Sequence, residues 1–203
     1  MKRFALALGA AVFAAGIAGP ALAEKIQLSR ISAYFNSFAT AQAAFTQVNA
    51  DGSVSTGRLM LKRPGKARFE YDPPNKALVI AGSGRVAIFD DKSNQPPEQY
   101  PLDQTPLSVI LAARVDFAAA QMVVGHDGDA DATRVIAQDP AHPEYGKIAL
   151  VFSDDPVELR QWIITDGTGQ PTTVILDQMQ TGMDLPTRFF DIVGETRRRT
   201  GEN

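Results

Sequence analysis

Cysteine is missing from this sequence of 203 residues, which also has only two histidines and one tryptophan. Without cysteine the chain cannot form disulfides, thiolate metal sites or a cysteine nucleophile. The chain also lacks an excess of positive charge, and its net charge of -3 argues against nucleic acid as a partner. Beyond the N-terminal region, no apolar run predicts a membrane-spanning helix.

Residues that commonly support catalysis are scarce as well. His126 lies in a Gly-His-Asp-Gly turn and His142 in a loop with two prolines, so we expect both to be exposed loop residues. The sequence G-x-S-x-G, which marks the nucleophile of many lipid hydrolases, is absent. We therefore predict that the protein is not an enzyme and needs no cofactor.

One acidic run raises the question of a metal site. Asp127, Asp129 and Asp131 alternate, as oxygen ligands of calcium do in an EF-hand loop. Such a loop requires glycine at its sixth position and glutamate at its twelfth, where this chain has Ala132 and Gln138. We interpret the run as a solvated hairpin and predict no metal.

The N-terminus carries the pattern of an export signal. Lys2 and Arg3 precede an apolar run over 4–17, and Ala21-Leu22-Ala23 matches a cleavage site. We expect 1–23 to be a cleaved signal peptide, leaving a periplasmic protein with a single domain over 24–203. Because the first mature residue would be Glu24 rather than cysteine, we expect no covalent lipid anchor.

Short segments between turns dominate the mature chain and predict an antiparallel meander, so the fold class is mainly β with helices. The expected strands are 41–49, 54–63, 66–72, 76–81, 85–90, 122–126, 133–138, 147–153, 159–165 and 172–179. Gly125 to Gly128 and 166–169 are among the predicted turns.

Two helices are expected beside these strands. Over 24–37, apolar residues recur every three or four positions, which predicts an amphipathic helix that packs on a core or forms a lid. At Thr105, a capping hydroxyl precedes proline and a largely apolar helix. The apolar residues that we expect on one face of this second helix are Leu107, Ile110 and Leu111.

The C-terminus offers little pattern. Its last residues, 194–203, are polar, and we expect a flexible tail. Arg197, Arg198 and Arg199 form a basic patch within it that could touch anionic lipid, although three such charges are typical of a solvated terminus.

An ordered series of motifs resembles the LolA family of outer-membrane lipoprotein carriers. It consists of Phe45-Thr46-Gln47, the segment GRLMLKRP from Gly57 to Pro64, and the segment FEYDPP from Phe69 to Pro74. The resemblance covers Glu24 to about Ala113. Two departures are Ala87, where the family often has a bulky aromatic residue, and Gly82-Ser83-Gly84, where it often has Asp-Gly; we expect them to alter the shape of the cavity.

The resemblance implies an incomplete, strongly curved antiparallel β-barrel with an α-helical lid over an apolar cavity. Its ligands would be the acyl chains of acylated lipoproteins. It further implies that a monomeric carrier receives these lipoproteins from an inner-membrane lipoprotein-releasing ABC transporter and passes them to an outer-membrane acceptor lipoprotein.

Strand alternation provides candidates for the cavity wall. Leu59, Leu61 and Arg63 share one face of a predicted strand, and Phe69 and Tyr71 share one face of the next. Val79 and Phe89 complete the set of expected cavity residues. The same residues could instead fill an ordinary closed core, a possibility that alternation alone leaves open.

Arg63 is the exceptional member of this set because a buried guanidinium is costly unless its donors are satisfied. From the residues alone, a solvated arginine at a strand end is favoured. The resemblance implies instead that Arg63 bonds to the backbone of the lid and holds the cavity shut.

The sequence leaves a second function open. The same half-barrel could serve as a periplasmic lipid-binding sensor or regulatory domain, because a fold does not determine a function. Such sensors usually carry an additional interaction domain, for which this chain has no room.

Overall fold

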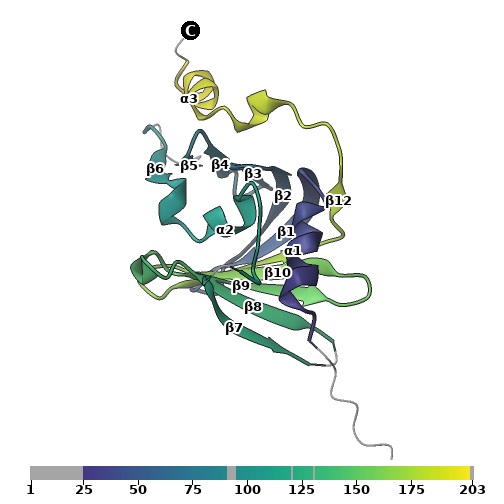
Figure 1. The fold of residues 1–203 in the computed structure, drawn as a ribbon. Helices are drawn as coiled ribbons and strands as arrows, with labels where there is room; N and C mark the ends of the chain where they lie inside the picture. Colours follow the sequence, from purple (N-terminus) through teal and green to yellow (C-terminus); the bar gives the residue numbers. More distant parts are fainter. Residues whose placement is uncertain (1–24, 91–94, 120, 130, 202–203) are drawn as a thin grey trace, which may run out of the picture.

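A single antiparallel sheet forms most of the protein, as the computed structural model shows for residues 25–90, 95–119, 121–129 and 131–201. The expected signal peptide, 1–23, lies outside these described residues. The strand order is β6-β5-β4-β3-β2-β1-β11-β10-β9-β8-β7, and the short β12 pairs with β1. Strands β6 and β7 are the two ends of this path, so the curved sheet does not close (Figure 1).

Twelve strands make up the sheet, and neighbours in the chain are mostly neighbours in space. The first group is β1 (Thr40–Val48), β2 (Val54–Lys62), β3 (Lys66–Tyr71), β4 (Leu78–Gly82), β5 (Arg85–Phe89) and β6 (Glu98–Pro101). The second group is β7 (Val123–Gly128), β8 (Thr133–Gln138), β9 (Lys147–Ser153), β10 (Glu158–Thr165), β11 (Pro171–Leu176) and β12 (Gln180–Thr181). The predicted meander and the mainly β fold class are therefore confirmed.

Alternating burial shows that one face of the sheet packs on a core. In β8 and β9 every second residue is buried, as expected when one face packs on a core and the other faces solvent. The concave faces of the two groups meet across the interior: the rings of Phe69 in β3 and Trp162 in β10 lie 6.3 Å apart, edge to face. One apolar core thus fills the space inside the curve.

Two helices lie against this concave side. Helix α1 (Leu28–Asn36) buries Ile31 and Phe35, and helix α2 (Leu107–Leu111) lies within the curve of the sheet (Figure 1). The 3-10 turn η1 (Leu102–Gln104) leads from β6 into α2, and η2 (Pro143–Tyr145) precedes β9. Thr105 does not cap α2 with its side chain, because its hydroxyl donates to the carbonyl of Leu102 instead.

The C-terminal segment is ordered, which corrects the expected tail. After β12 it crosses to the convex side, where η3 (Thr187–Phe190) and α3 (Ile192–Thr200) cover β3 to β5 (Figure 1). Polar composition suggested a frayed end, but the buried Ile192 and Glu195 fix the helix, and Asp191 caps it by accepting from the amide of Gly194. The helix ends at Gly201, whose φ of 71° is the left-handed conformation common at helix ends.

A separate apolar cluster lies under this segment on the convex face. Its buried members are Met60, Leu78, Ile80, Ala87, Phe89, Leu185, Phe190 and Ile192. Both departures from the family pattern belong here rather than to the cavity. Ala87 is fully buried in the cluster, and a Cβ on Gly82 would lie 2.3 Å from the carbonyl oxygen of Phe190. Small residues at these positions therefore let the C-terminal segment approach the sheet.

The ten predicted strands are all present, but the sequence missed two others and misplaced one turn. β6 is polar and ends in proline, and β12 has only two residues, so neither shows an alternating pattern. Gly125 to Gly128 lie within β7, not in a turn. A Cβ on Gly125 would lie 3.0 Å from the side chain of Ile136, so this glycine serves close packing between strands.

Three of the residues considered for catalysis and metal binding make side-chain contacts within the fold: His126, His142 and Asp129. His126 is half-buried in β7, where its Nε2 lies 2.9 Å from the carbonyl of Ile26, which corrects its expected place in an exposed loop. His142 is exposed and stacks on Tyr145. The carboxylate of Asp129 accepts from the amides of Asp131 and Ala132, which closes the hairpin turn.

Candidate functional site

The motif residues of the first strands form one aromatic layer on the concave face. Phe45 in β1 pairs directly with Gly57 in β2, and a Cβ on Gly57 would lie 2.8 Å from the Phe45 ring. The ring of Phe45 also meets Phe69 and Tyr71 edge to face, with centroids 5.7 and 5.2 Å away. The layer explains why an aromatic residue in one strand accompanies a glycine in the next.

Tyr71 ends this layer with a buried polar contact. Its hydroxyl donates to Oε1 of Gln47 at 2.6 Å, so the third residue of the Phe45-Thr46-Gln47 motif satisfies a group that would otherwise be desolvated. Burial raises the pKa of Tyr71 to about 12, against a lowering by this hydrogen bond. The phenol therefore stays neutral at ordinary pH.

Arg63 lies just beyond β2 and reaches the ends of both concave helices. Its Nε and Nη2 donate to the carbonyl of Ala112, at 3.0 and 2.7 Å, and its Nη1 donates to the carbonyl of Phe35. Ala112 follows the last residue of α2, and Phe35 is in the last turn of α1. One guanidinium thus satisfies carbonyls at two helix C-termini, where a positive charge is also electrostatically favoured.

The surroundings of Arg63 are unusual for a buried charge. Only 9 % of the residue is exposed, and none of the carboxylates in the described ranges forms an ion pair with it. Burial lowers its pKa from the ordinary arginine value. The charge is thus balanced by carbonyl dipoles, and the solvated arginine favoured by the residues alone is not what the structure shows.

Further hydrogen bonds, which no sequence pattern indicated, tie α1 to the segment after α2. The side chain of Asn36 donates to the carbonyl of Val115 at 2.7 Å and accepts from its amide at 3.0 Å. The hydroxyl of Ser32 accepts from the amide of Phe117 at 2.9 Å. The two helices and residues 112–117 therefore form one connected unit, which we call the helical cover.

Five of the six expected wall residues face this cover. Leu59, Leu61 and Phe69 are buried in the concave core, and Tyr71 and Val79 pack against it. Phe89 does not join them: it is buried in the convex cluster beneath Arg199. The physical reason is register, since Phe89 pairs with Leu78 and both side chains project to the opposite face from Val79.

The three expected residues of the second helix also turn inward. Leu107, Ile110 and Leu111 are 7 %, 1 % and 2 % exposed, so α2 buries most of its apolar surface in the core. Around α1, the rings of Tyr34, Phe35, Phe117 and Phe152 make edge-to-face contacts. In this state helices and aromatic side chains occupy the concave space, and the structure is closed.

An apolar hollow remains open beside the cover. Its volume is about 470 Å³, within the range of small-molecule sites. Val86 and Tyr100 form one wall, Leu107 at the start of α2 another, and Tyr145 and Ile164 belong to the opposite group of strands. Because α2 borders the hollow, movement of this helix would extend it into the core.

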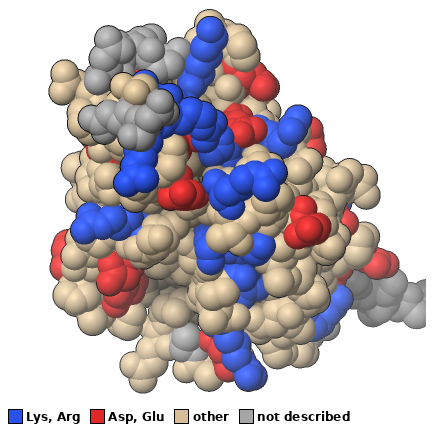
Figure 2. Space-filling model, turned by 90° about the horizontal axis from the view of Figure 1, so that it is seen from above, with Lys and Arg blue, Asp and Glu red and all other residues tan. Residues whose placement is uncertain are grey.

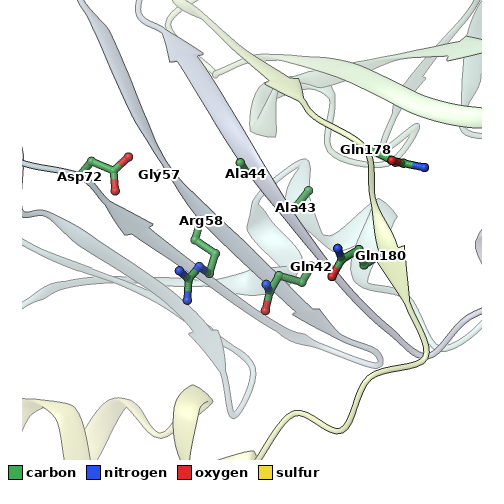
Figure 3. A pocket seen from close by; sticks show the side chains of 8 residues that line it. All are labelled: Gln42, Ala43, Ala44, Gly57, Arg58, Asp72, Gln178 and Gln180. Carbon is green, nitrogen blue, oxygen red and sulfur yellow. The ribbon is translucent and has the colours of Figure 1, made fainter.

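A second hollow, of about 290 Å³, lies between β1, β2 and the residues after β11 (Figure 3). Gln42, Arg58, Asp72, Gln178 and Gln180 give it a polar lining. An acyl chain would find no continuous apolar wall there, so the concave face is the better candidate for an apolar ligand.

The family model described as "Outer membrane lipoprotein carrier protein LolA" matches residues 36–193, which include the aromatic layer, Arg63 and the helical cover from Asn36 onward. The chain belongs to the LolA family. The expected family is thereby confirmed, and the match extends well beyond the range from Glu24 to about Ala113 that carried the resemblance.

This chain is similar to known lipoprotein carrier proteins along most of its length. The chain is 32 % identical over 190 residues to an outer-membrane lipoprotein carrier protein of Coxiella burnetii, covering 89 % of each chain. It is 26 % identical over 198 residues to one of Pseudomonas aeruginosa, covering 93 % of this chain and 91 % of the relative. Among solved structures, a LolA superfamily protein of Nitrosomonas europaea shows 11 % identity, with a TM-score of 0.44 over 82 % of this chain and 98 % of the other.

Proposed function

We propose that this member of the LolA family is a monomeric periplasmic carrier that receives acylated lipoproteins at the inner membrane and delivers them to the outer membrane. A lipoprotein-releasing ABC transporter would load it, and an acceptor lipoprotein of the outer membrane would unload it. Its role is binding, without catalysis or a cofactor. The observation that carries this proposal is the apolar concave face closed by a cover that Arg63 holds through backbone carbonyls.

A carrier of this kind must cover a large apolar surface of its cargo. Each methylene of an acyl chain costs about 0.8 kcal/mol when it is exposed to water, so a triacylated protein cannot cross an aqueous space uncovered. The concave face offers Leu59, Leu61 and Phe69 as an apolar wall. In the closed state the cover occupies this wall, and cargo must displace it.

Displacement also makes release possible. A carrier that bound its cargo with the full burial energy would keep it, whereas opening a closed cover offsets part of that energy. Arg63 would contribute to this offset, because opening the cover would break the bonds that it donates to the carbonyls of Phe35 and Ala112. We propose that the first chain enters at the hollow between Val86 and Leu107, because this hollow reaches the edge of α2.

Depletion of the protein in its native host, followed by membrane fractionation, tests the proposal. Lipoproteins destined for the outer membrane are expected to accumulate in the inner membrane. A complementing gene with Phe69→Asp should fail to restore sorting, because it places a charge in the apolar wall, whereas Arg134→Gln on the exposed side of β8 should restore it. Unchanged sorting after depletion would refute the proposal.

A further inference from the structure

The convex face of β2, β3 and β5 carries a series of positive charges. On β2, Arg58 and Lys62 share a face with Met60, which belongs to the convex cluster. On the paired strand β3 the same face holds Lys66 and Arg68, because Arg68 lies opposite Met60. On β5, Arg85 shares the face of Ala87 and Phe89.

The C-terminal segment adds to these charges. Arg188 lies in η3, and Arg197, Arg198 and Arg199 lie in the last turn of α3. Contacts place both elements over the same face, since Arg68 donates to the carbonyl of Phe189 and Lys62 donates to that of Leu185. Seen from the side of α3, Lys and Arg side chains gather across this face (Figure 2).

The acidic side chains on this face are occupied within the fold. Glu70 binds Arg68, Asp191 caps α3, and Glu195 binds Arg68, Arg198 and Arg199. Asp72, which lines the same hollow as Arg58, accepts from the hydroxyl of Thr56. Within the described ranges, Arg58, Lys66, Arg85, Arg188 and Arg197 form no ion pair. A face with uncompensated positive charge thus lies on a chain whose net charge is -3.

We propose that this convex face docks on a membrane surface rich in anionic phospholipid headgroups. The charges come from three strands and two helical elements and do not converge on a pocket, so they match an extended layer of negative charge better than a single small anion. Val193, which is 59 % exposed, lies one helical turn before Arg197 and offers an apolar contact on the same outer side of α3.

The position of the face fits this role. It is opposite to the concave side that holds α2 and the apolar hollow, so a docked protein keeps its opening free (Figure 1). Headgroup binding requires only the convex charges, so it is independent of the proposed carriage of acyl chains.

Vesicle flotation with the purified protein tests the proposal. Vesicles of phosphatidylglycerol and phosphatidylethanolamine should bind it at low salt and release it at high salt, and vesicles of phosphatidylcholine should not bind it. The double variant Arg58→Glu with Arg197→Glu should bind the anionic vesicles at least about tenfold more weakly than the parent. Neither residue contacts the concave site.

A matched variant, Arg134→Glu with Lys147→Glu, changes the net charge equally. These two cations are exposed on β8 and β9, far along the sheet from the convex patch, and form no ion pair with the described residues. It should keep most of its binding, and circular dichroism should show both variants folded. Equal loss in the two variants, binding to phosphatidylcholine through the apolar side, or no binding to anionic vesicles would each overturn the proposal.

Discussion

Arg63 and Arg68 are buried to the same extent, 9 % exposed each, but they hold opposite sides of the sheet by different means. On the concave side, Arg63 binds carbonyls and an amide oxygen of the helical cover and the carbonyl of Phe38, but no carboxylate in the described residues. On the convex side, Arg68 binds the carboxylates of Glu70 and Glu195 as well as the carbonyl of Phe189. The cover is therefore attached without a counter-charge, and the C-terminal helix is attached with one.

The difference matters for how easily each side opens. Carbonyls that lose an arginine can bind water instead. Breaking a buried ion pair costs several kcal/mol, because it leaves a buried charge without its partner. We infer that the concave attachment suits a part that opens during a working cycle and the convex attachment suits one that stays in place.

Glu195→Ala should have the largest effect. It leaves Arg68 buried with only the half-exposed Glu70 as a counter-charge, and we expect the free energy of unfolding to fall by about 3 kcal/mol. Urea denaturation measures the loss. Asp154→Ala is the control, because it breaks the exposed pair with Arg30 and should cost less than about 1 kcal/mol. Equal losses in the two variants would contradict the contrast.

Arg63→Leu should affect the cover more than the whole fold. Removing the guanidinium leaves the carbonyls of Phe35 and Ala112 without their donor and weakens the closed state by about 1–3 kcal/mol. Hydrogen exchange in 107–117 should therefore accelerate, and an apolar fluorescent probe should bind more tightly. If the proposed function holds, lipoproteins should load onto this variant but transfer poorly to the acceptor.

Because leucine also enlarges the apolar surface, Arg63→Gln provides the comparison. It keeps polarity while weakening the attachment, and it should show a partial version of the same changes. Parental exchange rates and probe affinity in both variants would mean that Arg63 does not hold the cover closed.

Lowering the pH should weaken the convex attachment and leave the concave attachment unchanged. Burial alone would raise the pKa of Glu195, but the hydrogen bond from Arg199 and the charges of Arg68, Arg198 and Arg199 outweigh it and hold this pKa below its usual range. A carboxyl with a lowered pKa in the folded state contributes stability above its unfolded pKa of about 4.3, and this contribution is lost as the pH falls through the folded pKa.

The stability difference between the parent and Glu195→Gln should therefore be constant above roughly pH 5 and shrink below it. The difference between the parent and Arg63→Leu should not change over the same window, because no carboxylate in the described part of the chain pairs with Arg63. Urea denaturation across this pH range measures both differences. A parallel decline of the two would show that the acid effect is not specific to the convex side.

Local patterns were enough to predict most of the fold. Alternation over 54–63 and 66–72 gave two strands and their inward residues, and the three- and four-residue spacing of Leu28, Ile31 and Phe35 gave a helix. The predictions of Phe89 in the cavity wall and of a flexible tail over 194–203 were wrong for one shared reason. Which face of β5 is covered depends on a segment a hundred residues later, and no local pattern records that contact.

The same limit applies to the candidate site. The family motif directed attention to Arg63, but its acceptors at Phe35 and Ala112 come from two distant helices, and the residues alone favoured a solvated side chain. Asn36 and Ser32 were missed because single polar residues on a helix give no signal of the backbone that they bind. The contacts between distant segments, more than the secondary structure, were therefore out of reach of prediction from the sequence.

Lys62→Met should have the smallest effect and should sharpen the comparison most directly. Lys62 precedes Arg63 but projects to the other face, where its ammonium donates to the carbonyl of Leu185 at 2.6 Å and approaches the hydroxyl of Thr187 at 3.4 Å. Methionine keeps much of the apolar stem and removes the donor, so we expect a loss of about 0.5–1 kcal/mol. Hydrogen exchange should accelerate in 183–190 and remain unchanged in 107–117. Arg63→Leu should give the reverse pattern, so that two adjacent residues separately control the two faces of one strand. Faster exchange in both segments of either variant would mean that the convex and concave attachments are coupled through the sheet.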